Sequence, residues 1–555
     1  MFGIYGRRPT RDMVSLFRDT GASGVLLLAR NIESTQQVRA LTHGLMDRLG
    51  RPLIFAIDHE GGWVLRFRSG LTAFPGNAAL GRCRDPRLAY ATGRQMALEL
   101  APLGIGMNLA PVLDVGVGRY NPGIGIRSFG SDPALVSRLA TAFLRGLQDH
   151  GVAACAKHFP GKGAATKDAH VDLPTIRLPK TEFFRTHLAP FAAATRAGVA
   201  AVMTSHVRYP ALDRRPASFS RRITRDLLRR RLGFRGVIIS DDLCMGAVTS
   251  RGPVPTAAWD AFKAGHDIIM VAHDPSAQRE SVDLFRSMQA SGGLPASELK
   301  AATGRIAALL KFPRPSRRAP DPKTGAELAL RVARRAVAIA RSGTLPLPLP
   351  QGEGRTLVLF PDFMDVRERF TFEGGPHGPK DFLRRLLPRW ARLMHTPMEN
   401  GPDARFRQRL NDAIDQAELI VFFCFEALRF AGQRAVLRMV NHAAPRRSVA
   451  CLIRNSFDIS LLSRRVTTVD AYGYRLCQLQ AALELIWGNK NHENPHLRTQ
   501  PLSRRVYGGD GGGKGAAVPE GQAFSSPGRG RHDPEHPHDH PRRRAAQQQP
   551  GRTPR

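Results

Sequence analysis

Cysteine, acidic residues and long apolar runs are all scarce in this 555-residue sequence. Its six cysteines are widely spaced and form no CxxC pair, so neither a disulfide framework nor a cysteine-ligated metal is predicted. No stretch of about 18 apolar residues occurs, and the N-terminus lacks the apolar core of a signal peptide. These absences exclude a membrane span and favour a protein of the reducing cytoplasm.

The shortage of acid leaves a large positive charge. Against 82 Lys and Arg there are 47 Asp and Glu, which gives a formal net charge of +35. Such an excess suggests nucleic acid or another anionic polymer as a partner, because clustered Lys and Arg neutralise phosphates. The arginines, however, are spread along helical segments such as 221–235, and aromatic residues make up only 7% of the chain. A basic polymer-binding protein therefore remains the non-enzymatic alternative, and nucleic acid is disfavoured as a partner.

Apolar runs with the character of strands alternate with amphipathic helical patterns over residues 1–312. Most of the eight runs are continuously hydrophobic, as expected of strands buried on both faces. Helical patterns lie between them, for example at 34–50 and 275–291. Eight β/α units in about 300 residues predict a TIM-like (β/α)8 barrel, with a doubly wound open sheet as the alternative. The eight runs are residues 2–5, 24–30, 52–58, 106–115, 152–158, 201–207, 236–242 and 266–272.

A second α/β domain is predicted over residues 326–488, after a Pro- and Arg-rich linker at 313–325. It contains helical patterns at 326–340 and 479–488. From residue 489 onward the composition changes, and the end of the chain is rich in Gly, Pro, Arg, His and Gln. Such a chain buries too little surface to offset its ordering entropy, so 489–555 is predicted to be a disordered low-complexity tail. The strand-like runs of the second domain are residues 355–360, 418–425, 448–454 and 467–473.

Polar side chains stand at the ends of five of the predicted barrel strands. In a TIM barrel the carboxyl ends of the strands line the active site. A single polar residue at a strand end often only caps a neighbouring element or forms an ion pair in the core. Polar residues at the same end of five strands, however, predict a catalytic face. The residues are Asp58, Asp114, Lys157 with His158, Ser205 with His206, and Asp241 with Asp242.

Three residues have the character of a nucleophile and a proton-transfer pair. Asp241 directly follows a predicted buried strand, where its carboxylate is suited to attack an electrophilic carbon or to stabilise a cation. Asp168 lies two residues before His170 in a loop rich in Gly and Ala. An Asp so placed can hydrogen-bond one imidazole nitrogen and stabilise the imidazolium. Since histidine titrates near neutrality, His170 is able both to give and to take a proton.

Residues 20–275 contain, in this order, the motifs AIDHEGGWVLRF, LAPVLDV, IGIRSFG, AKHFPGKG, KDAH, MTSHV and GFRGVIISDDLCM. With them the chain resembles the β-N-acetylglucosaminidases of glycoside hydrolase family 3. The later stretches LIRNSFDISLL, VDAYGY and LELIWG are similar to the αβα sandwich domain of two-domain members. The resemblance implies a retaining exo-enzyme that removes terminal N-acetylglucosamine from peptidoglycan fragments in cell-wall recycling, with no cofactor and no metal.

The resemblance also implies a role for each site residue. Asp241 would be the nucleophile that forms the glycosyl-enzyme, His170 the general acid/base, and Asp168 its orienting partner. A histidine in place of a second carboxylate adds no negative charge that would repel an anionic attacker, so a phosphorylase activity stays open. Another family 3 β-glycosidase specificity stays open as well. The implied substrate-binding residues are Asp58, Arg66, Arg127, Lys157 and His158.

Three residues depart from the family pattern. Lys162 stands where the family usually has His, and His59 and Trp63 replace the usual Gln and Arg. Lys162 is either a solvent-facing side chain or a positive charge that lowers the pKa of His170 or binds an anionic substrate group. Trp63 either stacks on a sugar face or packs within the protein. None of the three is one of the implied catalytic residues.

Overall fold

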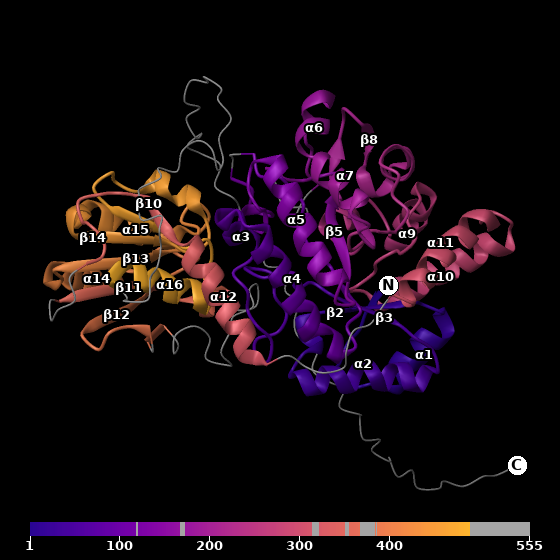
Figure 1. The fold of residues 1–555 in the computed structure, drawn as a ribbon, viewed down its shortest axis with the longest axis horizontal. Coiled ribbons are helices and arrows are strands. Elements are labelled where there is room, and N and C mark those ends of the chain that lie inside the picture. Colours follow the sequence, from indigo (N-terminus) through magenta and orange to yellow (C-terminus); the bar gives the residue numbers. More distant parts are fainter. Residues whose placement is uncertain are drawn as a thin grey trace, which may run out of the picture. The chain divides into compact units, whose positions relative to one another are not determined.

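Two sheets, each covered by helices, organise the chain in the computed structural model (Figure 1). The predicted tail 489–555 lies outside the described residues, as do Asp168 and His170. The described residues are 1–117, 120–166, 173–312, 321–349, 355–366, 383–384 and 386–488.

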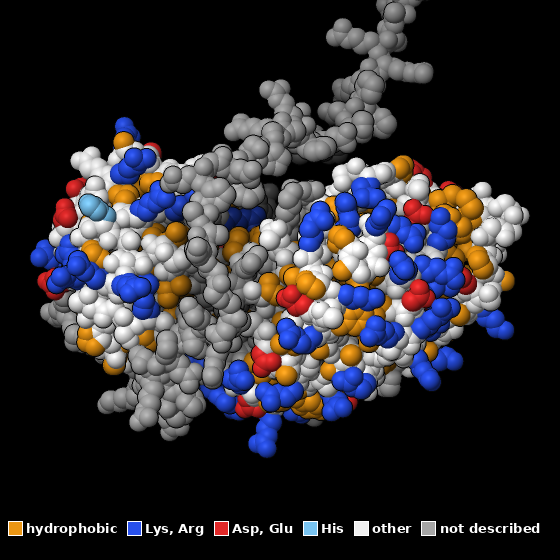
Figure 2. Space-filling view, turned by 90° about the horizontal axis from the view of Figure 1, so that it is seen from above, with side chains coloured by type: hydrophobic (Ala, Val, Ile, Leu, Met, Phe, Trp, Pro, Cys, Tyr) orange, Lys and Arg blue, Asp and Glu red, His pale blue; other side chains and the backbone are white. Residues whose placement is uncertain are grey.

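The distribution of positive charge can be followed on one face of the molecule. On the face seen in Figure 2, Lys and Arg side chains are scattered, with Asp, Glu and hydrophobic side chains between them. They form no single stripe on that face, in line with the spread of arginine along the sequence. Among the described helices, none combines the length and the apolar character needed to cross a bilayer.

The first sheet has seven parallel strands in the order β1-β2-β3-β4-β5-β6-β9. Its two edges are joined through the segment 268–271, because Val271 bridges to Phe2 of β1 and Ile268 bridges to Ile239 of β9. The sheet therefore curls, as a TIM-like domain requires, whereas a doubly wound sheet would leave these edges apart. The strands are β1 (Phe2–Gly3), β2 (Gly24–Leu27), β3 (Ile54–Ile57), β4 (Met107–Asn108), β5 (Ala153–Phe159), β6 (Ala201–Thr204) and β9 (Val237–Ile239).

Each of the first seven predicted strand runs overlaps one strand of this sheet, and the run 266–272 supplies the bridging segment. The predicted helical pattern 34–50 is α2, which Ser34 caps by accepting a hydrogen bond from the Gln37 amide and which Gly50 ends at a φ of 63°. These are ordinary start and stop signals of a helix.

The helices of this domain are α1 (Arg11–Thr20), α2 (Thr35–Leu49), α3 (Asn77–Cys83), α4 (Pro86–Leu100), α5 (Pro133–Gln148), α6 (Lys180–Thr186), α7 (Ala189–Arg196), α8 (Gly246–Thr249), α9 (Val254–Ala264), α10 (Pro275–Ala290) and α11 (Ala296–Leu310), with a further helical segment at Arg222–Arg231. A short antiparallel pair, β7 (Arg208–Tyr209) and β8 (Asp213–Pro216), lies outside the main sheet.

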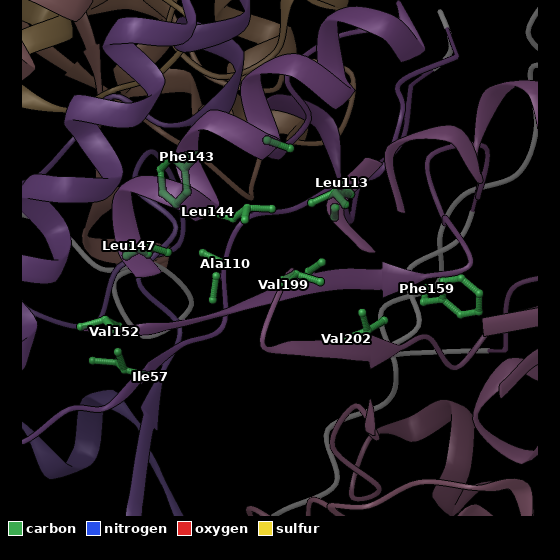
Figure 3. Close-up of a cluster of buried hydrophobic side chains, with 14 of the residues drawn as sticks. Ile57, Ala110, Leu113, Phe143, Leu144, Leu147, Val152, Phe159, Val199 and Val202 are labelled. Atoms are coloured by element: carbon green, nitrogen blue, oxygen red, sulfur yellow. The ribbon is translucent and has the colours of Figure 1, made fainter. Parts of the chain in front are cut away.

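Alternate residues of the barrel strands enter two different hydrophobic clusters. On β3, Ile54 and Ala56 belong to one cluster and Phe55 and Ile57 to the other. The second of these clusters includes the residues of α5 that Figure 3 shows beside β5 and β6. Burial on both faces explains why the strands are hydrophobic without a break. This packing fixes the strand ends that carry the site.

The second sheet has the strand order β10-β15-β14-β13-β11-β12, with β10 antiparallel to β15 and the other pairs parallel. Val358 and Phe360 face a cluster with residues of α12 and α16, whereas Leu357 and Leu359 face a cluster with residues of α14 and α15. Helices thus cover both faces. The elements are α12 (Pro322–Ala336), β10 (Ala338–Arg341), β11 (Thr356–Pro361), β12 (Ala391–Thr396), α14 (Ala404–Gln416), β13 (Leu419–Cys424), α15 (Ala431–Ala443), β14 (Ser448–Leu452), β15 (Thr467–Asp470) and α16 (Leu476–Trp487).

Two local predictions in the second domain differ from the structure. The helix predicted over 326–340 ends at Ala336, and Ala338–Arg341 pairs as β10 with β15 instead. Its Ala- and Arg-rich pattern has high helical propensity, but the free edge of β15 provides a sheet partner that local sequence does not reveal. Helix α12 also begins at Pro322, inside the predicted linker 313–325. Strand β12 was not predicted, because its mixed polarity suits a partly exposed edge strand.

Candidate active site

Charged side chains meet where β3 and β5 end. Asp58 directly follows β3, and Glu60 comes two residues later. The Lys157 ammonium on β5 lies 2.7 Å from Asp58 Oδ1 and 2.6 Å from Glu60 Oε1, so it bridges the two carboxylates. Arg66 completes the group from the far side of the turn, with Nη2 2.8 Å from Asp58 Oδ2. The structure therefore brings together three of the predicted substrate-binding residues.

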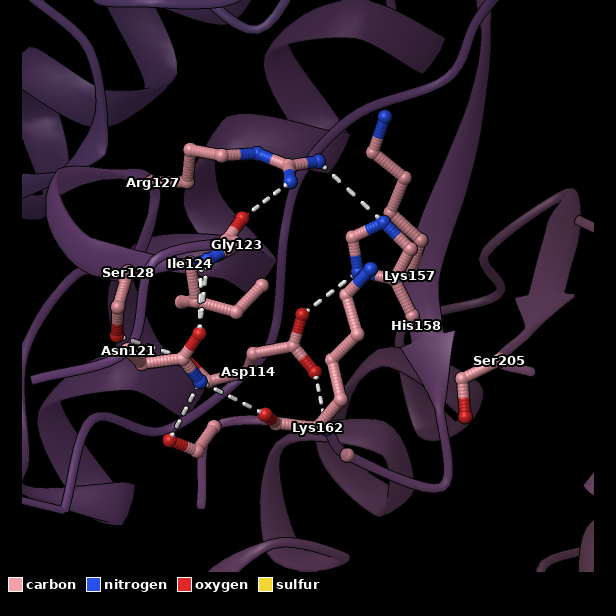
Figure 4. A network of polar contacts seen from close by, with 12 residues as sticks. Asp114, Asn121, Gly123, Ile124, Arg127, Ser128, Lys157, His158, Lys162 and Ser205 are labelled. Carbon is pink, nitrogen blue, oxygen red and sulfur yellow. Dashed lines mark hydrogen bonds and ion pairs between the residues drawn. The ribbon is translucent and has the colours of Figure 1, made fainter. Parts of the chain in front are cut away.

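Arg127 joins this group through Glu60. Its Nε and Nη2 donate hydrogen bonds to the two oxygens of Glu60, at 2.9 and 2.8 Å. Its Nη1 donates to the carbonyl of Gly123 at 2.7 Å (Figure 4). Bidentate pairs of this kind fix orientation as well as supply energy. Arg127 is thus held by a carboxylate that the sequence analysis had not assigned to the site.

Mutual attraction keeps this cluster ionised despite its burial. Burial opposes the charge of Asp58, but Lys157 and then Arg66 outweigh it, and the pKa of Asp58 falls below its usual range. Burial likewise opposes the charge of Glu60, and Arg127 and Lys157 hold its pKa below the usual value. For Lys157, burial lowers the pKa but the two carboxylates raise it more. The cluster is a fixed array of charges suited to hydrogen-bonding hydroxyl groups.

His158 links Arg127 to Asp114. Its Nδ1 lies 2.7 Å from Asp114 Oδ2, and its Nε2 lies 3.3 Å from Arg127 Nη2 (Figure 4). Because a guanidinium only donates, Nε2 accepts from Arg127 and Nδ1–H donates to Asp114, which describes a neutral imidazole. Burial raises the pKa of Asp114 to about 6, against the opposing charge of Lys162. The contacts of both ring nitrogens therefore fix the orientation of the His158 imidazole.

Lys162 is only 6% exposed, so the solvent-facing interpretation is wrong. Its amide donates a hydrogen bond of 2.6 Å to Asp114 Oδ1, and its carbonyl accepts one from the Asn121 side chain. Its charge acts on the carboxylate of Asp114 and on His206. Lys162 thus adds positive charge inside the site. Its effect on His170 stays a prediction, since His170 lies outside the described residues.

Asp241 follows β9, and its contacts differ from those of its neighbour Asp242. The Asp242 carboxylate accepts hydrogen bonds from the Ala272 amide at 2.9 Å and pairs with His273 Nδ1 at 2.6 Å, which makes it a local structural group. Asp241 Oδ1 accepts from the Asp242 amide at 3.0 Å, and its charge acts on Cys155 and His206. Its carboxylate therefore acts on one residue within β5 and on one just beyond β6.

Trp63 is partly buried and packs against the hydrophobic clusters of both domains, and stacking of its ring on a sugar stays a prediction. The Arg454 guanidinium lies 3.1 Å from the centroid of its ring. Its neighbour in the family pattern, His59, is buried, and burial, with the charge of Arg475 next, lowers the pKa of His59 to about 3. Both departures from the pattern therefore adjoin arginines of the second domain.

Glu60 and the pairing of Asp114 with His158 are site features that only the structure reveals. Glu60 alternates with Asp58 just beyond a strand, a spacing that could have marked it. Asp114 was noted as a polar strand end, but its partner His158 is known only from the structure. Asp168 and His170 are not tested by these contacts. Among the described residues, no group of three or more His, Cys, Asp or Glu is placed to hold a metal ion.

Comparison with known proteins agrees with this architecture. Residues 3–309 match the glycosyl hydrolase family 3 N-terminal domain. A beta-hexosaminidase of Neisseria meningitidis serogroup C (strain 053442) is 39% identical over 293 residues, which cover 52% of this chain and 81% of the relative. A beta-hexosaminidase of Thiobacillus denitrificans is 40% identical over 281 residues, covering 50% of this chain and 78% of the relative.

Two solved structures extend the comparison. A glycoside hydrolase family 3 beta-N-acetylglucosaminidase from Paenibacillus sp. matches with a TM-score of 0.79 and 30% identity, covering 88% of this chain and 95% of its own. NagZ from Neisseria gonorrhoeae, solved with N-trifluoroacetyl-D-glucosamine, matches with a TM-score of 0.52 and 33% identity, covering 60% of this chain and 97% of its own. The chain belongs to glycoside hydrolase family 3 and is a glycoside hydrolase.

Proposed function

We propose that this chain is a retaining exo-β-N-acetylglucosaminidase of the cytoplasm that removes terminal N-acetylglucosamine from peptidoglycan fragments in cell-wall recycling. The observation that carries the proposal is the ionised cluster of Asp58, Glu60, Arg66, Arg127 and Lys157 at the ends of β3 and β5, in the same parallel sheet as β9, the strand that Asp241 follows. Its similarity to beta-hexosaminidases and to a NagZ solved with an N-acylglucosamine supports this substrate.

Exposure divides the proposed substrate-binding residues into two groups. The side chains of Asp58 and Arg66 are 17% and 29% exposed, whereas that of Lys157 is 3% exposed. Asp58 and Arg66 are therefore proposed to contact sugar hydroxyls directly. The more deeply buried residues, Lys157, Arg127 and His158, are proposed to keep Asp58 and Arg66 charged and in position. Where one of these three also contacts a sugar hydroxyl, it does so at the edge of the cluster.

The proposed reaction proceeds in two steps. Asp241 attacks the anomeric carbon, the glycosidic bond breaks, and the leaving oxygen takes a proton from His170. Water then attacks the same carbon and gives its proton to His170, which frees the sugar and restores the Asp241 carboxylate. Asp168 orients His170 and stabilises its imidazolium. The two inversions give net retention at the anomeric centre.

Hydrolysis of 4-nitrophenyl N-acetyl-β-glucosaminide tests the proposal. We expect Asp241→Ala to abolish release of nitrophenol, and His170→Ala to lower kcat/KM by about 10²- to 10⁴-fold, the usual contribution of general acid–base catalysis. Asp260→Asn, a substitution at an exposed helix position that pairs with Lys263, is the control and should leave activity unchanged. Full activity in both site variants would refute the assignment of these residues.

The same assay shows which sugar the enzyme cleaves and whether water or phosphate accepts the glycosyl group. Parallel reactions with the glucoside substrate and with added inorganic phosphate separate the proposed hydrolase from another β-glycosidase and from a phosphorylase. We expect cleavage of the N-acetylglucosaminide alone and no sugar 1-phosphate. A fluorosugar that traps the glycosyl-enzyme should add its mass to the peptide that contains Asp241. A label on a different peptide would contradict the proposed nucleophile.

A further inference from the structure

Two arginines of the second domain are buried against one turn of the barrel. Arg454 and Arg475 are 2% and 1% exposed, and they are among the largest fully buried side chains of the described residues. Arginine is seldom fully buried unless it is paired, because desolvating a guanidinium is costly. Both side chains contact the barrel at residues 62–63, between Asp58 and Arg66.

Arg475 binds the backbone of this turn. Its Nε donates to the carbonyl of Gly62, and its Nη2 donates at 3.4 Å to the carbonyl of Trp63. Gly62 has a φ of 57°, and the Glu60 amide donates across the turn to the Val64 carbonyl at 2.9 Å. The planar guanidinium donates to two neighbouring carbonyls from two separate nitrogens held in a fixed geometry, which the single nitrogen of an ammonium does not reproduce and an apolar side chain lacks altogether.

Arg454 holds the same turn by packing on the side chain of Trp63. Its guanidinium lies 3.1 Å from the centre of the Trp63 ring, an arrangement in which the ring face attracts the cation. Glu426 forms an ion pair with Nη1 of Arg454 and has a φ of 47°. A non-glycine residue in this left-handed conformation is disfavoured, so the contact with Arg454 is kept against a backbone cost.

The place of these residues in the second sheet is also informative. Glu426 and Arg454 follow strands β13 and β14, and Arg475 lies beyond β15 at the start of α16. The carboxyl ends of parallel strands are where open α/β sheets usually bind ligands. In this protein that edge contacts the turn of the barrel that carries Asp58 and Glu60.

We propose that Arg475 and Arg454 are positioning residues of the active site, through which the second domain holds the turn 58–66 in the geometry that binds the sugar. Movement of this turn would displace Asp58 and Glu60 from Lys157, which lies 2.7 and 2.6 Å from them. The functional part of this inference rests on the proposed function of the site. The structural part, that the two arginines restrain the turn, does not.

Hydrogen exchange and kinetics on the full chain test the two parts separately. In Arg475→Met we expect faster amide exchange over residues 59–65 and a rise of about tenfold in KM for the N-acetylglucosaminide, the order expected from a small misplacement of binding groups. Loss of folded protein alone lowers apparent kcat without changing KM. Arg454→Met should act in the same direction.

Arg335→Met is the matched control. Arg335 also connects the second domain to the barrel, with Nη1 2.9 Å from Asp85 Oδ2, but it does not touch the turn 58–66. Exchange over 59–65 and KM should stay at wild-type values in this variant. Arg475→Lys, which keeps the charge but loses the fork, should give intermediate exchange, and it carries the exchange test if Arg475→Met does not fold.

Each outcome tests either the structural part of the inference, its functional part or the proposed function. Wild-type exchange over 59–65 in folded Arg475→Met, or in Arg475→Lys where that variant carries the test, would overturn the inference. Faster exchange with unchanged KM would overturn its functional part. If the wild-type enzyme does not cleave the N-acetylglucosaminide, the proposed function fails, and the exchange comparison, which needs no substrate, still decides whether the arginines restrain the turn.

Discussion

Replacing Glu60 with glutamine measures how much the buried charges of the cluster depend on one another. The Glu60 side chain is 2% exposed and pairs with both Lys157 and Arg127. Removing one partner of a buried ion pair costs about 3–5 kcal/mol, because the other charge is left uncompensated. Lys157 keeps Asp58 at 2.7 Å, so we expect Glu60→Gln to lose about 3 kcal/mol of unfolding free energy, the lower end of that range.

Glu484→Gln is the control for this prediction. Glu484 also receives a bidentate contact, from Nε and Nη2 of Arg334 at 2.8 Å each, but the Arg334 side chain is 29% exposed. An ion pair open to water contributes only about 0–1 kcal/mol. Urea unfolding at pH 7, followed by tryptophan fluorescence and near-UV circular dichroism, compares the two variants with the wild type. Equal losses in both would refute the argument that burial sets the magnitude.

The pH dependence of the Glu60 effect follows from the direction of its pKa. Arg127 and Lys157 overcome the effect of burial and hold the folded-state pKa of Glu60 below the unfolded value, which is about 4.3. Its stabilising contribution is therefore present above about pH 4.3 and is lost as the pH falls through the folded value. The difference between the wild type and Glu60→Gln should be constant near neutrality and shrink in acid. A difference that grows in acid would contradict this sign.

Two further predictions concern a buried histidine and a close backbone contact. Burial lowers the pKa of His187 to about 4, so between pH 6.5 and 4 the unfolded state binds its proton first, and stability falls with falling pH by at most about 1.4 kcal/mol per unit. In His187→Leu the urea midpoint of unfolding should change less with pH between pH 6.5 and 4. An unchanged slope of midpoint against pH would contradict the assignment of this loss to His187. A Cβ on Gly163 would lie 1.8 Å from the Val115 carbonyl oxygen, so Gly163→Ala should lower kcat/KM about tenfold or more by moving the site loop. Gly304→Ala, whose Cβ meets nothing within 4 Å, should leave kcat/KM unchanged, and equal activity in the two variants would refute the steric argument.

Local patterns carried the prediction of the strands and of several site residues. Asp58, Lys157 and Asp241 each follow or lie in an unbroken apolar run, so their place at strand ends could be predicted from the sequence alone. Strands buried on both faces need such runs, and parallel strands place their carboxyl ends together. The same reasoning failed at 338–341, where a residue pattern with helical propensity pairs as β10 because β15 offers a free edge.

The partners of these residues could not be predicted in the same way. Glu60 has no feature in the sequence that ties it to Arg127, which is 67 residues away, and Trp63 gives no sign that Arg454 lies over its ring. Lys162 in a Gly-rich loop has the composition of an exposed residue, yet it is buried because its amide and carbonyl are held by Asp114 and Asn121. Contacts over such sequence separations exist only once the chain is folded.

The sequence by itself determined the alternation of strand and helix, the chemical types at the strand ends, and the order of the family motifs. Those properties depend on hydrophobic periodicity and on residue identity, which are local. Tertiary structure decided which carboxylate each cation pairs with, the neutral tautomer of His158, and the contact of the second domain with the turn 58–66. These depend on distances of a few ångströms between distant segments, and electrostatic energy and hydrogen bonding change steeply over that range.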